Sequence, residues 1–311
     1  MLLQTFRKKH PSAFCSGEIM ISGLILALSG GAFWAVLGIV TACGKKQNAP
    51  IEIVQPFAGI IILIFAGWTV LLEGPFIWDR SSVILLLTTL LVGVCNYFML
   101  NVLQRGMKAG REGVVWAFSQ SAMICPFALG LLCFSEPAAL SRIIGLLLIL
   151  SALILFSMGR KTDCGRSGGW FGPTIAAFVI AGIAQCFASL PSYFQMQGLT
   201  PLRRMLILQG GIILAFLCDN LIRSNKIDFR NRKAWLFAAA FGFSNLIALI
   251  LFYSGQNLLA DAKCASISYP AGQGVSIALV FLYGCLKARP DRLAVCAFCL
   301  LLCGLVFLSL Q

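Results

Sequence analysis

Two glutamines lie within stretches of sequence that are otherwise apolar enough for the interior of a membrane. Gln120 stands in WAFSQSAMI and Gln273 stands in YPAGQGVSI. Each follows an aromatic residue, Trp116 or Tyr269, by four positions, so the two side chains of each pair lie on one face of a helix. A polar side chain at membrane depth requires a partner, and it usually faces the interior of a helix bundle or a water-filled cavity. These positions therefore indicate a polar cavity or a set of interhelical hydrogen bonds.

Similar stripes of aromatic and polar residues occur on other apolar segments. The candidate binding residues are Trp34, Tyr97, Asn101, Trp116, Gln120, Gln185, Asn245, Tyr269, Gln273 and Ser276. Ring faces provide contact area and amides fix orientation, so together they predict a pocket for a small polar or amphipathic solute. The alternative is that these amides and hydroxyls join neighbouring helices through hydrogen bonds. The small residues beside Gln120 and Gln273 fit both interpretations, because they permit either a ligand or close helix packing.

The segments that must position these residues are long and apolar. The chain has 311 residues, of which 59% are hydrophobic and 11% are charged, whereas a soluble domain has about 25% charged residues. A helix of about 20 apolar residues spans a bilayer. The predicted spans are 20–43, 53–72, 83–103, 113–134, 140–158, 168–193, 205–222, 235–253, 265–286 and 293–310. The sequence therefore predicts an all-α polytopic membrane protein with ten transmembrane helices.

The two halves of the chain resemble each other. At an offset of 153, Gln120 falls on Gln273, and at an offset of 151, Gly59 falls on Gly210. The predicted units are a first five-helix repeat at 20–158, a linker at 159–167 and a second five-helix repeat at 168–310. Because five is odd, the second repeat enters the membrane from the opposite side, which is an arrangement typical of secondary transporters.

Residues 1–19 are predicted to form an N-terminal leader without regular structure, and Met20 is an alternative start of the chain. The basic residues near the start, followed by an apolar run that ends in VTAC, resemble a lipoprotein signal. The hydrophobic part of a signal peptide has roughly 7–15 residues, and the run at 20–43 is longer. A first transmembrane helix is therefore the preferred interpretation.

The fourth and fifth helices of each half carry a further pattern. In the first half, PFALGLLCFSEPAALSRIIGLLLILSALILFS has Glu136 just after the fourth helix and Gly145 in the fifth. In the second half, the corresponding pair of helices is formed by ISYPAGQGVSIALVFLYGCLKARPDRLAVCAFCLLLCGLVFLS, which contains Tyr269, Pro270 and Gly304. This pattern resembles the EamA-type transporters of the drug/metabolite transporter superfamily. The resemblance implies ten helices, cytoplasmic termini and transport of a small organic solute by alternating access.

Charged residues restrict the substrate. The predicted first helix contains no acidic residue, whereas the proton-coupled small multidrug pumps of this superfamily carry a Glu there; Asp219 comes closest to the membrane interior. Arg289 stands where the second half of the family usually repeats the Glu, so Glu136 is expected to be structural. The basic residues are predicted to lie between the spans, which disfavours a sugar phosphate or nucleotide. The remaining substrate class is a neutral or zwitterionic metabolite, such as an amino acid or sugar.

Other activities lack the residues that they require. His10 is the only histidine, so neither a Ser–His–Asp triad nor a histidine metal site is available, and the chain has no P-loop. Cys296 and Cys299 have CxxC spacing but lie in an apolar helix, where Cys packs as a small hydrophobe. The net charge of +13 is attributed to anionic lipid headgroups and not to nucleic acid, because the basic residues flank the spans. We therefore expect no enzymatic activity and no cofactor.

Two indications of orientation disagree. The odd-numbered loops hold 16 Lys and Arg residues, whereas the N-terminal segment and the even-numbered loops hold 8. This count favours termini outside the cytoplasm, but the family resemblance implies termini inside it, and we adopt the latter as the prediction. The sequence thus predicts a small-solute carrier in a bacterial inner membrane, acting as a monomer or homodimer. The alternative is a non-transporting membrane sensor or assembly subunit that retains the same fold.

Overall fold

The computed structural model describes residues 13–47, 49–73, 80–109, 112–137, 139–158, 171–195, 199–223, 231–287 and 292–310. The predicted linker at 159–167 and residues 1–12 of the predicted leader lie outside these ranges. The remainder of the predicted leader is helical, since the first helix begins at Ala13, seven residues before Met20.

Helices joined by short turns make up the described part of the chain, which contains no strand. In chain order they are α1 (Ala13–Lys46), α2 (Ile51–Leu72), α3 (Arg80–Ala109), α4 (Glu112–Gln120), η1 (Ser121–Met123), α5 (Ile124–Cys133), α6 (Leu140–Met158), α7 (Phe171–Tyr193), α8 (Pro201–Arg223), α9 (Arg232–Asp261), η2 (Ala265–Ile267), α10 (Ser268–Lys287) and α11 (Arg292–Ser309). Eight apolar segments of the described chain are long enough to cross a membrane, and two shorter apolar helices lie at Leu140–Leu155 and Val295–Leu308. Each predicted span coincides with one of these segments. The prediction of an all-helical membrane protein is confirmed at this level.

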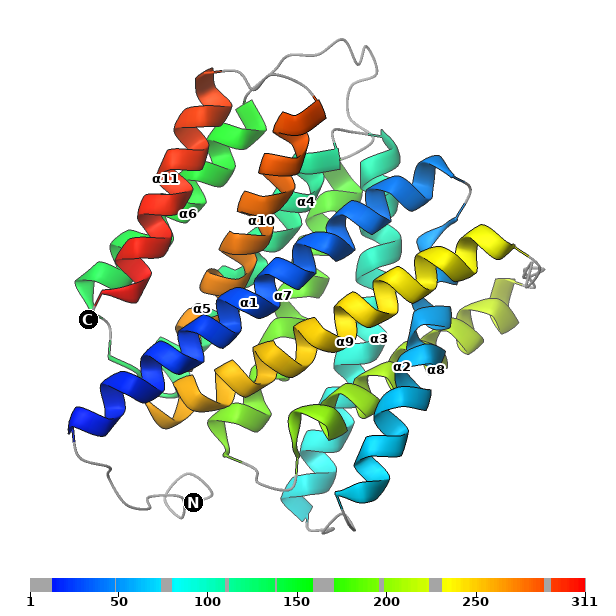
Figure 1. The fold of residues 1–311 in the computed structure, drawn as a ribbon, viewed down its shortest axis with the longest axis horizontal. Coiled ribbons are helices and arrows are strands. Elements are labelled where there is room, and N and C mark those ends of the chain that lie inside the picture. Colours follow the sequence, from blue (N-terminus) through cyan, green and yellow to red (C-terminus); the bar gives the residue numbers. More distant parts are fainter. Residues whose placement is uncertain are drawn as a thin grey trace.

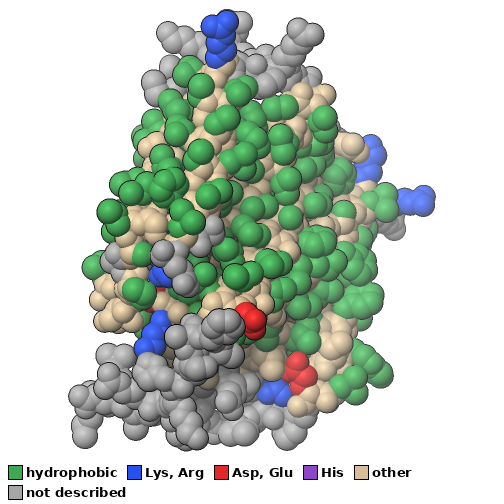
Figure 2. Space-filling view, turned by 60° about the vertical axis from the view of Figure 1, so that its left-hand side comes forward, with side chains coloured by type: hydrophobic (Ala, Val, Ile, Leu, Met, Phe, Trp, Pro, Cys, Tyr) green, Lys and Arg blue, Asp and Glu red, His purple; other side chains and the backbone are tan. Residues whose placement is uncertain are grey.

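The sides of the molecule are apolar. Figure 2 shows hydrophobic side chains over most of the visible face, with few charged side chains among them. Large apolar residues such as Trp68, Leu132 and Leu221 are 71%, 83% and 82% exposed. Soluble proteins rarely expose a continuous apolar surface of this extent, so these side chains face lipid. The chain is therefore an integral membrane protein.

Two of the helical spans contain a short 3-10 turn near a proline. η1 separates α4 from α5, and Pro126 lies in the first turn of α5. A proline within a helix lacks an N–H group, and its ring crowds the carbonyl four residues earlier, which is that of Ala122 in η1. Pro270 of α10 stands in the same relation to Ser266 of η2. The prolines thus account for the position of both turns.

Helices from the two halves of the chain pack against one another (Figure 1). α1 lies against α9 and α10, and α3 lies against α7 and α8. α2 contacts α8 and α9, while α6 and α11 pair with each other at the side of the bundle. Glycines allow direct backbone contact, because a methyl group at Gly31 would overlap the carbonyl of Gly272, and one at Gly93 would overlap the carbonyl of Leu208. Close approach of this kind stabilises helix pairs in membranes.

The differences from the predicted spans that affect buried polar residues concern α8 and α9. α8 begins at Pro201, four residues before the predicted start at 205, and α9 continues to Asp261, eight residues beyond the predicted end at 253. Polar residues such as Gln256 lower the local hydropathy, although the helix continues through them. As a consequence, Arg204 belongs to the first turn of α8 and is only 2% exposed. The prediction that the basic residues lie between the spans is therefore wrong for Arg204.

Candidate functional site

A cavity of about 120 Å³ lies within the bundle between α1, α2, α3, α4, α7, α8, α9 and α10. Seven of the ten predicted binding residues line it: Trp34, Trp116, Gln120, Gln185, Asn245, Tyr269 and Gln273. The other wall residues are Leu37, Gln55, Val92, Asn96, Met99, Leu100, Ala181, Ala184, Ala188, Leu208, Ile212, Phe241, Leu249 and Tyr253. An apolar cavity of about 150 Å³ binds a molecule the size of benzene, so this cavity has room for a small solute.

Amide side chains in the cavity wall make no hydrogen bonds with the described part of the protein. They are Asn96, Gln120, Asn245 and Gln273. Three further wall atoms, Gln55 Oε1, Gln185 Oε1 and Trp116 Nε1, are buried without a hydrogen-bond partner among the described residues. Buried polar groups are normally paired, so these atoms are available to a solute or to water. The interhelical hydrogen bonds that were the alternative for Gln120 and Gln273 are not observed within the described ranges.

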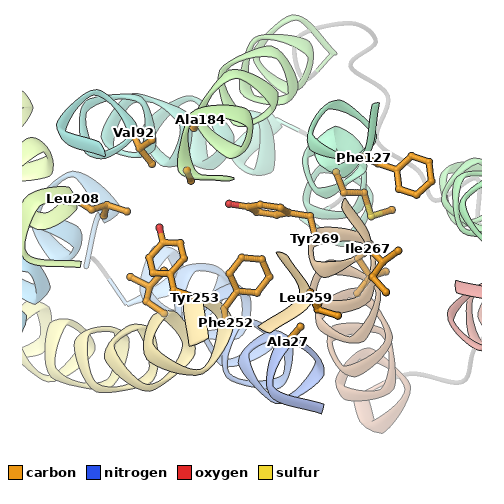
Figure 3. Close-up of a cluster of buried hydrophobic side chains, with 14 of the residues drawn as sticks. Ala27, Val92, Phe127, Ala184, Leu208, Phe252, Tyr253, Leu259, Ile267 and Tyr269 are labelled. Atoms are coloured by element: carbon orange, nitrogen blue, oxygen red, sulfur yellow. The ribbon is translucent and has the colours of Figure 1, made fainter. Parts of the chain in front are cut away.

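Aromatic side chains cover one side of the cavity. The ring centroid of Trp34 lies 4.4 Å from that of Phe252 and 6.4 Å from that of Tyr269, with which it is stacked at an interplanar angle of 18°. Figure 3 shows Tyr253 of α9 and Tyr269 of α10 directing their hydroxyl oxygens into the space near Ala184 of α7. The wall thus combines ring faces for contact with hydroxyl and amide groups for hydrogen bonding.

Three predicted binding residues lie outside the cavity wall. The hydroxyl of Tyr97 donates a hydrogen bond to Asp219 Oδ2 at 3.1 Å, which joins α3 to α8. Asn101 and Ser276 are 5% and 0% exposed, and their side-chain oxygens have no hydrogen-bond partner among the described residues. Tyr97 therefore has the helix-joining role that the sequence left as the alternative.

Three polar residues of the wall, Gln55, Asn96 and Tyr253, were not among the predicted binding residues. Asn96 directly precedes Tyr97, and consecutive helix positions differ in direction by about 100°, so the predicted stripe is a neighbouring face of α3. A repeat offset of 149 relates Asn96 to Asn245 and also relates Gly93 to Gly242. This register is the signal in the sequence that identifies Asn96, because it pairs Asn96 with a residue that was predicted.

A second group of polar side chains lies about one helical turn beyond the cavity. We call it the polar cluster, and its members are Ser189, Ser192, Arg204, Gln256, Asn257 and Ser268. Ser192 Oγ accepts a hydrogen bond from Arg204 Nη1 at 2.7 Å and lies 2.8 Å from Asn257 Oδ1. Gln256 Nε2 donates to the hydroxyl oxygens of Ser189 and Ser268 at 3.2 and 3.3 Å. Unlike the cavity amides, these side chains of α7, α8, α9 and α10 are hydrogen-bonded to one another.

Glu136 lies at the same end of the bundle as the polar cluster. Both of its carboxylate oxygens accept the backbone N–H of Ser266, at 3.2 and 3.1 Å, so the turn after α5 is joined to η2. Burial raises the pKa of the neighbouring Cys264 thiol to about 11. These contacts give Glu136 a structural role, which agrees with the expectation from its position at a helix end.

The other end of the cavity is packed mainly with apolar side chains, although Gln104, whose Oε1 accepts the backbone N–H of Ile51, is also buried there; we call this region the apolar end. Its buried residues include Leu37, Val40, Ile51, Val54, Phe57, Leu100, Leu103, Met107, Val115 and Phe241. They come from the C-terminal ends of α1 and α3 and from the N-terminal parts of α2, α4 and α9. The cavity therefore lies between two ends of different chemistry.

Within the described residues, no group of three or more His, Cys, Asp or Glu side chains is placed to hold a metal ion. No family model and no curated protein matches the sequence. Among solved structures, 28 chains match. One of them, described only as the crystal structure of a protein, has a TM-score of 0.69 and 16% sequence identity, covering 93% of this chain and 98% of that chain. At this identity the likeness shows the fold alone.

Proposed function

We propose that this chain is a secondary membrane transporter that moves a small neutral or zwitterionic metabolite, of the amino acid or sugar class, by alternating access. The observation that carries the proposal is the central cavity, whose amides have no hydrogen-bond partner in the described part of the protein. A polar group inside a membrane is costly unless a partner, water or a solute satisfies it. The unpaired amides therefore support solute binding in preference to helix adhesion.

We further propose ten spans in two inverted repeats, as in the EamA-type transporters that the sequence resembles. The first repeat would contain α1, α2, α3, α4 with α5, and α6; the second would contain α7 to α11 in the same order. Helix packing supports this arrangement, since α1 against α9 corresponds to α7 against α3, and α2 against α9 corresponds to α8 against α3. The pairs α2–α8 and α6–α11 each join equivalent helices. A two-fold axis in the membrane plane produces such contacts.

The composition of the cavity wall also supports the repeat. Several aromatic and amide residues of the wall occupy equivalent positions in the two proposed repeats. The pairs are Trp34 and Gln185 at an offset of 151, Asn96 and Asn245 at an offset of 149, Trp116 and Tyr269 at an offset of 153, and Gln120 and Gln273 at the same offset of 153. Sites of this kind, at the interface of two inverted repeats, become accessible from either side in turn when one repeat rocks against the other.

A non-transporting sensor or assembly subunit with the same fold is the second candidate. Polar stripes sealed in direct interhelical hydrogen bonds would favour it, and Tyr97 with Asp219 forms one such bond. The cavity amides form none within the described chain, so the carrier has the better support. We place the carrier in a bacterial inner membrane, as a monomer or homodimer, without enzymatic activity or a cofactor.

The test begins with thermal stabilisation of the purified protein by amino acids, sugars and nucleosides, followed by uptake of each stabilising solute into proteoliposomes. We expect Gln120→Leu and Gln273→Leu each to abolish stabilisation and uptake at unchanged expression, because leucine keeps the size of the side chain and removes the amide. Gln209→Leu is the matched control, since Gln209 is 1% exposed but lies outside the cavity wall. Normal transport by both cavity variants would contradict the assignment of these residues.

A further inference from the structure

Arg204 is a charged side chain buried inside a transmembrane segment. It lies in the first turn of α8 and is 2% exposed. Its guanidinium carbon lies 5.7 Å from the ring centroid of Tyr253, which is a residue of the cavity wall. The guanidinium donates hydrogen bonds to Leu199 O at 3.0 Å, Ser192 Oγ at 2.7 Å and Asn257 Oδ1 at 3.0 Å. All three acceptors are neutral oxygen atoms, so none of these hydrogen bonds supplies a negative charge to balance the guanidinium.

No acidic side chain in the described ranges forms an ion pair with Arg204. The adjacent Arg203 pairs with Glu73 at 3.2 Å, and Glu136 is bonded to Ser266. Burial of a charge without a counter-ion is costly. The N-terminal end of a helix adds to this cost for a cation, because the helix dipole is positive there. Packing alone does not account for an arginine at this position, and its uncompensated charge indicates an anionic ligand.

The polar cluster continues the wall of the cavity toward one end of the bundle. On α8, Arg204 precedes the wall residue Leu208 by four positions, and on α9, Asn257 follows the wall residue Tyr253 by four. Residues four apart lie on the same face of a helix. A solute that leaves the cavity along these faces therefore meets the polar cluster next.

At two equivalent positions of the other repeat, the described residues are apolar. At an offset of 151, Arg204 corresponds to Ile53, and at an offset of 149, Gln256 corresponds to Met107. Met107 belongs to the apolar end, and Ile53 packs against it. If the fold required a charged residue at this position, both repeats would be expected to carry one. The charge at Arg204 is therefore attributed to a function at one end of the cavity.

We propose that Arg204 and the polar cluster bind the carboxylate of the transported solute, one helical turn beyond the cavity. This inference rests on the proposed function and narrows its substrate class to zwitterionic solutes that carry a carboxylate, such as amino acids, in preference to sugars. Arginine has five N–H donors, and three of them are engaged by described residues. A carboxylate accepts two parallel hydrogen bonds from a guanidinium. The ligand thus supplies both the missing acceptors and the missing negative charge.

The test compares each carboxylate with its neutral amide, using the purified full chain in nanodiscs. Thermal stability is measured with sodium acetate, sodium lactate and L-alanine, and with acetamide, lactamide and L-alaninamide, at constant ionic strength. We expect at least one carboxylate to raise Tm in a saturable way and its amide to bind about tenfold more weakly or worse, because a charge-assisted bidentate pair is lost. Arg204→Gln is expected to lose this discrimination. Arg203→Gln removes the adjacent guanidinium, which pairs with Glu73 and is not part of the polar cluster, and this variant is expected to retain the discrimination.

Equal stabilisation of the wild-type protein by carboxylate and amide would overturn the anion site, and this result requires no variant to fold. Discrimination that persists in Arg204→Gln would overturn the role of Arg204. Stabilisation by the amides alone, abolished by Gln120→Leu, would overturn the anion site and leave the cavity proposal in place. Absence of stabilisation by every charged and neutral solute would contradict both proposals.

Discussion

The polar cluster and the apolar end close the same cavity with opposite chemistry. At the polar cluster, hydrogen bonds join side chains of α7, α8, α9 and α10, and Arg204 adds a charge. At the apolar end, Val54 and Met107 are each 2% exposed among other apolar side chains. Hydrogen bonds require defined partners, whereas apolar contact is non-directional. The difference indicates that the proposed repeat determines the positions of the helices, whereas the polarity of the side chains at each end of the cavity can differ between the repeats.

The largest effect is expected when a charge is placed at the apolar end. Val54→Arg would bury a guanidinium in a region that is packed mainly with apolar side chains. An uncompensated buried charge costs about 3–5 kcal/mol, so we expect loss of most folded protein, measured as the yield of monodisperse protein after detergent extraction. Val54→Leu is the control at the same site and is expected to fold. A normal yield of folded Val54→Arg protein would contradict the expectation that the apolar end does not tolerate a buried charge.

An exchange between equivalent positions is expected to have an intermediate effect. Gln256→Met removes the hydrogen bonds to Ser189 and Ser268, and interhelical hydrogen bonds in membranes contribute about 0.6 kcal/mol each on average. The reverse change, Met107→Gln, buries an amide in the apolar end at a cost of about 1–3 kcal/mol. Both variants are therefore expected to lower the free energy of unfolding, measured by denaturant titration in mixed micelles. An unchanged free energy of unfolding in either variant would show that the stability of that end of the cavity does not depend on the polar or apolar character of the substituted residue.

The smallest effect is expected at Thr41, which corresponds to Ser192 at an offset of 151. Thr41 Oγ1 donates to the carbonyl of Leu37 within its own helix at 2.8 Å, and such a bond adds little to stability. We expect Thr41→Val to change the free energy of unfolding by less than about 0.5 kcal/mol. Ser192→Ala, which loses contacts with α8 and α9, is expected to cost about 1 kcal/mol. Tm is measured for both variants in parallel. A larger decrease of Tm in Thr41→Val than in Ser192→Ala would contradict the proposed difference between the two ends of the cavity.

The positions of the helices were predictable because the bilayer imposes a simple rule on the sequence. Long apolar runs mark each span, and every predicted span coincides with a helical segment. The predicted repeat also identified part of the cavity wall. Gln120 and Gln273 are polar residues at equivalent places in apolar surroundings, and both line the cavity. Matched polar residues are informative because leucines align by chance and glutamines do so much less often.

The remainder depended on tertiary packing that hydropathy does not report. α3 carries polar residues on adjacent faces, and only the packing of α7 and α8 against it decides that Asn96 faces the cavity while Tyr97 faces Asp219. Arg204 was assigned to a loop because the adjacent charges of Arg203 and Arg204 shorten the apolar window. Its burial follows from Ser192 and Asn257 on two other helices, whose proximity the linear sequence does not reveal.

The direct backbone contact between Gly31 of α1 and Gly272 of α10 has a mechanical consequence. A Cβ atom at Gly31 would meet only backbone atoms of Gly272, so the two helices touch through their backbones and have no side chains of their own at the point of contact. Trp34 follows Gly31 by three positions, and Gln273 is next to Gly272, so residues of the cavity lie close to this point. In the proposed carrier, this contact would act as a pivot: when one repeat rocks against the other, the ends of α1 and α10 would move farther than the cavity residues beside the glycines.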